Sequence, residues 1–118
     1  MCGRLNIIQD PLCEIVTQAL GQPFKTTNNP DLRPTEKVAT IAQINGKYAQ
    51  LDASWGIKPS WAKKLLINAQ AETVSSKPTF RKQFLSQRCV VPCSGWYEWS
   101  SNLTANKQKY LFRPRQNE

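Results

Sequence analysis

The first chemistry that the sequence offers lies at its N-terminus, Met1-Cys2-Gly3-Arg4. Because residue 2 is small, we expect Met1 to be removed, which leaves Cys2 with a free α-amine beside its thiol. An α-amine titrates near ~7.7–8.0 and a cysteine thiol near ~8.5, so both groups are partly nucleophilic around neutral pH. An amine and a thiol on adjacent carbons condense with an aldehyde to a five-membered thiazolidine. The alternative is an inert cysteine, since so short a motif carries little weight without structural context.

The residue types that are absent limit the remaining chemistry. The chain contains no His, which excludes Ser-His and Cys-His catalysis from its own residues. Proton transfer must then use a carboxylate, an amine, a thiol or a tyrosine. We interpret the cysteines as reduced thiols, with a four-thiolate zinc site as the less favoured alternative, and we expect no metal or cofactor. These cysteines are Cys2, Cys13, Cys89 and Cys93.

The chain is strongly basic. Its 16 Lys and Arg against 8 Asp and Glu give a net charge of +8, and the basic residues are spread along the whole length. Such a field favours a polyanionic partner, most simply nucleic acid, and a basic protein without one is the alternative. At 118 residues the chain is long enough for one domain. It has neither an apolar run of the ~18 residues that a membrane span needs nor a signal peptide, so we expect a cytoplasmic protein without a membrane partner.

The secondary structure expected from the sequence determines how these functional groups are positioned. Residues 4–8 are expected to form a strand, and a helix should open at Asp10-Pro11 and end at Gly21. Residues 22–36 are rich in Pro and Asn, which predicts an irregular loop. The apolar stripe of the expected helix is Leu12, Ile15, Val16, Ala19 and Leu20.

The rest of the chain reads mainly as strands. Asn45-Gly46 is a strong hairpin signal between strands at 37–44 and 47–55. From a short basic helix, Phe80, Phe84 and Leu85 should face inward. An α+β fold is predicted, with a curled, mostly antiparallel, barrel-like sheet and a few short helices. The further elements are a strand at 65–71, the basic helix at 78–87, and strands at 88–91, 95–99 and 107–113.

Two polar patterns lie on expected strands. Residues 67–73 alternate with a period of two, so Asn68, Gln70 and Glu72 would share one face, although an ordinary half-exposed strand explains the pattern too. In the segment 95–99, Glu98 stands among large aromatic residues. A carboxyl group desolvated by such neighbours has a raised pKa, which suits proton transfer. The alternative is a solvent-facing Glu98 whose aromatic neighbours point away.

Trp55 and Trp61 flank a turn that contains Lys58. Burial statistics favour packing in the core for both tryptophans. Aromatic side chains beside a cation also form stacking platforms for unpaired bases, which is the functional alternative.

Six motifs, in order and at similar spacing, resemble those of the SOS-response-associated peptidases (SRAP), a family named for autoproteolytic removal of the initiator Met. The resemblance covers about the N-terminal half of that family's domain, so residues 1–118 are expected to be the N-terminal part of a single SRAP-like domain. The motifs are Met1-Cys2-Gly3-Arg4, Trp55-Gly56…Pro59-Ser60-Trp61-Ala62, Asn68-Ala69-Gln70-Ala71-Glu72-Thr73, Lys77-Pro78-Thr79-Phe80-Arg81, Arg88-Cys89-Val90-Val91-Pro92 and Gly95-Trp96-Tyr97-Glu98-Trp99.

The resemblance implies a DNA-damage-response protein that senses and shields abasic sites in single-stranded DNA, by crosslinking and lyase chemistry. Cys2 would form the thiazolidine with the ring-opened sugar. Asn68 resembles the asparagine that holds the N-terminal residue and the sugar, and Glu98 the glutamate that shuttles protons. The DNA-binding residues implied are Arg4, Trp55, Trp61, Gln70 and Arg81.

Three departures from the family pattern stand out. The family usually has Arg at the position of Gln70. Its Asn-x-x-Pro loop reads Asp31-Leu32-Arg33-Pro34 here, which places an acid in it. The family's active-site His belongs to a C-terminal segment that these residues do not include.

Two functions follow, and a thiol peptidase that acts on other proteins is a less favoured third, because no His or other evident base serves the cysteine. The first is covalent capture of abasic sites through Cys2. The second is an inactive half-domain that acts only as a basic module for single-stranded DNA or for another partner. In either case the sheet would end at residues 107–113 with an unpaired edge, which favours a homodimer.

Overall fold

The computed structural model describes residues 2–101 and 107–115. They fold into two compact units, described in turn below: unit 1 takes in Met1–Pro34 and Cys93–Glu118, and unit 2 takes in Thr35–Pro92. Short helices and antiparallel strands confirm the predicted α+β class. The strands in the described residues form two open sheets, where a single curled sheet was predicted. No helix in the described residues is long and apolar enough to cross a membrane.

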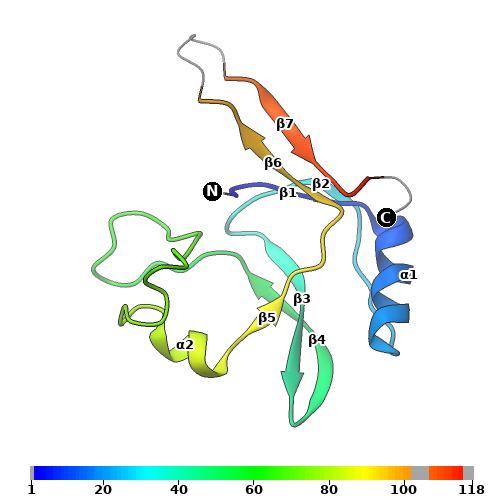
Figure 1. Ribbon diagram of the computed structural model, residues 1–118, viewed down its shortest axis with the longest axis horizontal. Helices are drawn as coiled ribbons and strands as arrows, with labels where there is room; N and C mark the ends of the chain where they lie inside the picture. Colours follow the sequence, from blue (N-terminus) through cyan, green and yellow to red (C-terminus); the bar gives the residue numbers. More distant parts are fainter. Residues whose placement is uncertain (1, 102–106, 116–118) are drawn as a thin grey trace. The chain divides into compact units, whose positions relative to one another are not determined.

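The sheet of unit 1 has the spatial order β2-β1-β6-β7, with every neighbouring pair antiparallel (Figure 1). The N-terminal strand β1 therefore lies inside the sheet, between strands from two distant parts of the sequence. The cause is the pairing of Leu5 with Leu32 on one side and with Trp96 on the other. The strands are β1 (Leu5–Ile7), β2 (Asn29–Leu32), β6 (Gly95–Trp99) and β7 (Lys109–Phe112).

Helix α1 (Gln9–Leu20) follows β1 directly and ends as predicted at Gly21, which has a left-handed φ of 70°. The Gly21 amide donates a hydrogen bond to the Thr17 carbonyl at 2.9 Å. The stripe prediction is wrong for Ile15, which is 58% exposed, and for Ala19, which is also exposed. The face that is covered runs through Leu12 and the positions four and eight residues later, and Ile15 lies outside it. The buried apolar side chains of unit 1 are Ile7, Leu12, Phe24 and Leu32.

Strand β2 corrects the prediction of an irregular loop over residues 22–36, because Asn29–Leu32 pair with β1. Pro30 cannot donate a backbone hydrogen bond, which is tolerated since β2 is the edge of its sheet. The Pro30 carbonyl instead accepts a hydrogen bond from the Tyr97 hydroxyl at 2.7 Å. Pairing with a neighbouring strand has here outweighed the local turn signals.

The sheet of unit 2 has the order β4-β3-β5, and it contains the predicted hairpin. Strands β3 (Lys37–Ile44) and β4 (Lys47–Ser54) are joined by Asn45 and Gly46, whose φ values of 51° and 78° fit a tight hairpin turn. Strand β5 (Cys89–Val90) pairs with the other side of β3.

Two expectations for the middle of unit 2 are wrong. Residues 65–71 do not form a strand: Leu66 makes one isolated bridge to Ile57, and a turn begins at Gln70, whose carbonyl accepts two backbone hydrogen bonds. The basic helix is present as α2 (Arg81–Ser86), but Leu85 points outward and is 77% exposed. With only a single bridge to hold them, the alternating residues have no ladder that would keep them extended.

Candidate functional site

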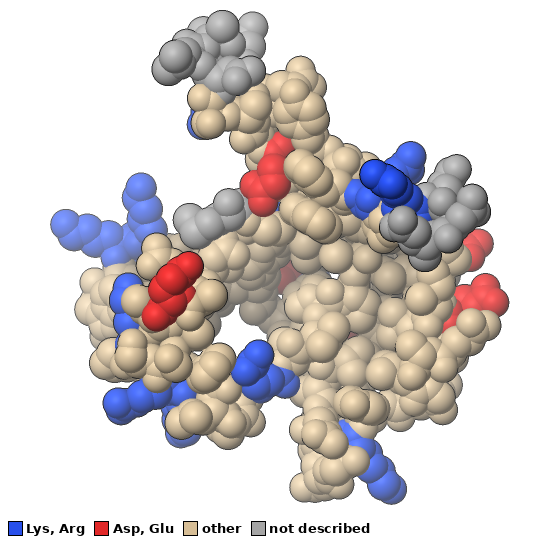
Figure 2. Space-filling view, in the orientation of Figure 1, with Lys and Arg blue, Asp and Glu red and all other residues tan. Residues whose placement is uncertain are grey.

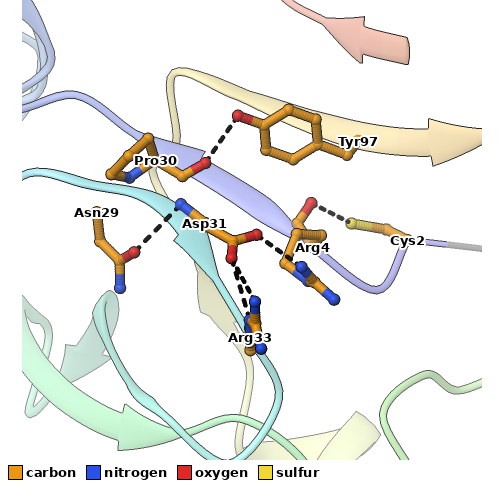
Figure 3. Close-up of polar contacts among 7 residues, drawn as sticks. All are labelled: Cys2, Arg4, Asn29, Pro30, Asp31, Arg33 and Tyr97. Carbon is orange, nitrogen blue, oxygen red and sulfur yellow. Dashed lines mark hydrogen bonds and ion pairs between the residues drawn. The ribbon is translucent and has the colours of Figure 1, made fainter. Parts of the chain in front are cut away.

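Cys2 lies three residues before β1 and is half-buried. Its thiol donates a hydrogen bond to the Arg4 carbonyl, with a sulfur–oxygen distance of 3.6 Å (Figure 3). The same carbonyl accepts the backbone amide of Tyr97 at 3.0 Å, so it is fixed by the neighbouring strand β6. The backbone of unit 1 thus holds the thiol close to the start of a central strand. Met1 lies outside the described residues.

Among the other cysteines, Cys93 is less suited to act as a nucleophile. Burial raises the pKa of the Cys93 thiol; the Gly95 amide partly opposes this rise, and the charge of Cys2 adds to it. A raised pKa leaves less of the reactive thiolate at neutral pH. Cys13 is half-buried and its thiol is directed to the Thr26 carbonyl at 3.9 Å. Within the described residues, no group of Cys, Asp and Glu side chains is arranged as a metal site.

Glu98 lies on β6, beside the strand that follows Cys2, and is half-buried. Its partner across the sheet is Tyr110 of β7. The same face carries Trp96, which stacks on Phe112 with ring centroids 5.5 Å apart. Trp96 remains 40% exposed, so Glu98 lies on a partly open aromatic face.

On the opposite face of β6, five side chains form a linked group, here called the Asp31 cluster. Asp31 accepts a hydrogen bond from Arg4 at 2.6 Å and two from Arg33 at 2.8 and 3.1 Å (Figure 3). The Arg4 guanidinium carbon lies 5.6 Å from the centre of the Trp99 ring, and the Lys109 ammonium lies 5.7 Å from the same centre. The members of the cluster are Arg4, Asp31, Arg33, Trp99 and Lys109.

The Asp31 cluster makes the stability of the protein sensitive to acid. Hydrogen bonds from Arg4 and then Arg33 lower the pKa of Asp31 from its ordinary 3.8 to about 2. Because the folded pKa is the lower one, ionised Asp31 stabilises the fold above its unfolded pKa, and this contribution is lost as the pH falls toward 2. We expect Asp31→Asn to reduce the fall in urea midpoint between about pH 5 and pH 2. Asp52→Asn, at an exposed position of β4, should leave that fall unchanged.

The predicted sugar-binding residue Asn68 belongs to unit 2, where it is exposed and lines a hollow of about 180 Å³. The hollow is otherwise apolar, and its remaining lining residues are Gly56, Ile57, Leu66, Ile67, Ala69 and Phe80. Trp55 fixes this loop, because its indole N–H donates to the Ile67 carbonyl at 2.9 Å. Gly56 is required at its position, since its φ is 100° and a Cβ atom would come within 2.8 Å of the Leu65 side chain.

The other predicted DNA-binding residues of unit 2 are accessible but do not share one strand face. Trp61 is 68% exposed, so core packing, favoured by burial statistics, is wrong for it. Gln70 lies at the start of a turn, and Arg81 is the first residue of α2; both are exposed. The shared face predicted for Asn68, Gln70 and Glu72 is absent because these residues are not in a strand.

The positive charge is unevenly divided between the units. Unit 2 contains nine Lys and Arg against three Asp and Glu, and unit 1 contains seven against five. Basic side chains accordingly outnumber acidic ones over unit 2 on the face drawn in Figure 2. The electrostatic attraction for a polyanion is therefore strongest at unit 2.

The sequence did not predict the contacts of Arg33 with Asp31, of Lys109 with Trp99, or of Tyr97 with the Pro30 carbonyl. Asp31 stood out only as an acid in a loop where the family usually has Asn. One signal was present: an acidic residue two positions before Arg33 in a chain of high positive charge. The pairing with Arg4 depends on β2 lying beside β1, and β2 was not predicted.

The SOS response associated peptidase (SRAP) model matches residues 1–118, and the chain belongs to this family. Abasic site processing protein YoqW of Bacillus subtilis is 32% identical over 108 residues, which cover 84% of this chain and 48% of YoqW. Abasic site processing protein YedK of Escherichia coli is 27% identical in an alignment 121 residues long, which covers 96% of this chain and 54% of YedK. The chain thus spans about half the length of these relatives.

The fold is also found in a crystal structure. A phage-related protein from Bordetella bronchiseptica superimposes with a TM-score of 0.72 at 25% sequence identity. The superposition covers 93% of this chain and 54% of that protein.

Proposed function

We propose that this chain binds single-stranded DNA and captures abasic sites by forming a covalent thiazolidine with Cys2. The observation that carries the proposal is the placement of Cys2, half-buried and hydrogen-bonded at the head of a central strand. The family membership and the names of the curated relatives support abasic-site processing as the reaction class.

The reaction needs no cofactor. The α-amine of Cys2 adds to the aldehyde carbon of the ring-opened deoxyribose, and loss of one water gives an imine. The thiol sulfur then adds to the imine carbon, its proton passes to the nitrogen, and the five-membered ring closes. Because an amide nitrogen is not nucleophilic, Met1 must be removed before the first step. Methionine-free protein, seen by intact mass, is therefore the reactive form.

Glu98 is the proposed proton shuttle. Formation of the imine requires a proton on the departing hydroxyl and the removal of one from nitrogen, and a single carboxyl group can perform both transfers in turn. Glu98 is suited to this role because β6 adjoins β1 and the carboxyl is half-buried beside Trp96. Asn68, at its small hollow, is proposed to hold the sugar.

The DNA strand is proposed to bind through charge and stacking. Arg4 and Arg81 would contact phosphates, with Gln70 as a neutral hydrogen-bonding contact. Trp61 has the exposure that stacking on a base requires, and Trp55 shapes the adjoining loop. The excess of basic residues in unit 2 supplies the sequence-independent part of the affinity.

The test is a denaturing gel of the methionine-free protein with a single-stranded oligonucleotide that carries one abasic site. A slow band that survives denaturation is expected with the natural abasic site. No such band should form with a tetrahydrofuran analogue, which lacks the aldehyde. Tight binding to both oligonucleotides without a covalent band would favour the second function, a non-covalent module for single-stranded DNA.

We also propose that the chain self-associates through β7. Among the described strands, β7 has a single neighbour, β6, so one side of its backbone is unpaired. Tyr110, Leu111 and Phe112 are each more than two-fifths exposed. An exposed apolar edge strand pairs readily with a second copy. Light scattering over a concentration series should show a rise from monomer to dimer mass, and a constant monomer mass would contradict this.

A further inference from the structure

The Asp31 cluster contains three cations around one carboxylate and one indole ring. Arg33 and Arg4 both donate to Asp31, while Arg4 and Lys109 lie near Trp99. The side chains of Arg4 and Asp31 are 25% and 38% exposed, so solvent reaches the ion pair. The cluster is therefore accessible to a ligand from outside.

Asp31 satisfies the two guanidinium groups unequally. Arg33 uses two nitrogens on one carboxylate oxygen, whereas Arg4 gives the other oxygen a single nitrogen. The Arg4 Nε is buried and finds no acceptor within the described residues. Lys109 lies 4.2 Å from the centre of the Tyr97 ring and pairs with no carboxylate in the part of the chain that the structure describes. The cluster keeps a net positive charge and an unused donor.

We propose that Arg4, Arg33 and Lys109 form a phosphodiester site in which Asp31 is the resident counter-anion. The proposal rests on the proposed DNA binding and assigns new roles within it to Arg33, Lys109 and Asp31. A carboxylate held by two guanidinium groups occupies the geometry in which a phosphate would be bound. A DNA phosphate therefore contacts Lys109 directly but must displace Asp31 from the two arginines. Asp31 thus lowers the affinity of the chain for DNA by competing with phosphates for Arg4 and Arg33.

If Asp31 competes with DNA phosphates, removing its negative charge should strengthen the binding of DNA. Asp31→Asn removes the carboxylate that competes with phosphates for two guanidinium groups, and each additional phosphate steepens the plot of log affinity against log salt by about 0.7 for single strands. We expect the plot to steepen by about 0.7–1.4 and the affinity to rise at least about 3-fold at about 50 mM salt. The advantage should shrink by roughly 3- to 7-fold on going to about 200 mM.

The experiment measures fluorescence anisotropy of a short labelled oligo-dT without abasic sites, titrated with the full chain at several salt concentrations. Asp52→Asn is the matched control, because it makes the same change in net charge at an exposed position of unit 2. It should leave the salt slope unchanged. Arg4→Gln and Arg33→Gln, added to Asp31→Asn, should remove the gain.

A single variant keeps the proposal testable if Asp31→Asn does not fold. Lys109→Gln should lower the salt slope by about 0.7, because it removes the phosphate contact for which Asp31 does not compete. Equal binding by Asp31→Asn and Asp52→Asn would overturn the proposal. An unchanged salt slope with Lys109→Gln would also overturn it. Covalent capture by the parent chain is scored separately on the abasic oligonucleotide, so failure of the proposed function is recognised independently.

Discussion

Replacing Cys2 with Ala is expected to abolish the covalent product with abasic DNA while leaving non-covalent binding within about 2-fold of the parent. The α-amine of Ala can still form an imine, but no thiol is present to close the ring, and an imine hydrolyses. The measurement is the fraction of abasic oligonucleotide shifted on a denaturing gel. No stable product is expected within the detection limit of the gel, because the thiazolidine ring contains the sulfur atom of Cys2.

Three further variants separate the roles of the amine and the thiol. Cys2→Ser keeps the amine, so borohydride should trap its imine although no stable product survives without reduction. Cys89→Ala and Cys93→Ala remove thiols elsewhere in the chain and should react at the parent's rate. A stable, unreduced product with Cys2→Ala would show that thiazolidine formation is not the reaction.

Glu98→Gln is expected to slow formation of the covalent product by about 10²–10⁴-fold, the usual contribution of a general acid or base. Gln keeps the size and polarity of the side chain but cannot shuttle a proton. Binding of an oligonucleotide without an abasic site should stay the same, because the removed charge belongs to the chemical step. A time course of covalent product, with DNA saturating, measures the effect.

The matched control for this variant is Glu14→Gln. Glu14 is exposed on α1, where it accepts a hydrogen bond from Gln18 at 3.3 Å. The substitution Glu14→Gln makes the same change in net charge as Glu98→Gln. Its rate should equal that of the parent. If Glu98→Gln also reacts at the parent's rate, then Glu98 has a structural role and the proton is transferred by another group.

The features that the sequence predicted well are those with local causes. Asn45-Gly46 forms a hairpin because both residues accept a positive φ, and Gly21 ends α1 for the same reason. The features that it missed depend on a neighbour far away in the chain. Strand β2 exists because β1 is beside it, and residues 65–71 lack a strand because only Leu66 finds a partner. Local patterns do not contain that information.

The candidate site divides in the same way. Cys2 and Glu98 were identified by their residue types and motifs, and the structure places them in or next to the adjoining strands β1 and β6. The ion pair between Arg4 and Asp31 joins residues 27 positions apart. No periodicity predicts such a contact, because it is created by the register between β1 and β2. The ion pair therefore became visible only with the fold.

The central position of β1 has a practical consequence for anyone who produces this protein. Cys2 is only three residues from a strand that is hydrogen-bonded on both sides, so a very short segment connects the proposed nucleophile to the sheet. Such a tether holds the amine and thiol near one place before the aldehyde arrives, which lowers the entropy lost in the reaction. Any residue left in front of Cys2 blocks the amine and has little slack with which to move aside. Purification handles therefore belong at the other end of the chain, or must be cut off without leaving a scar.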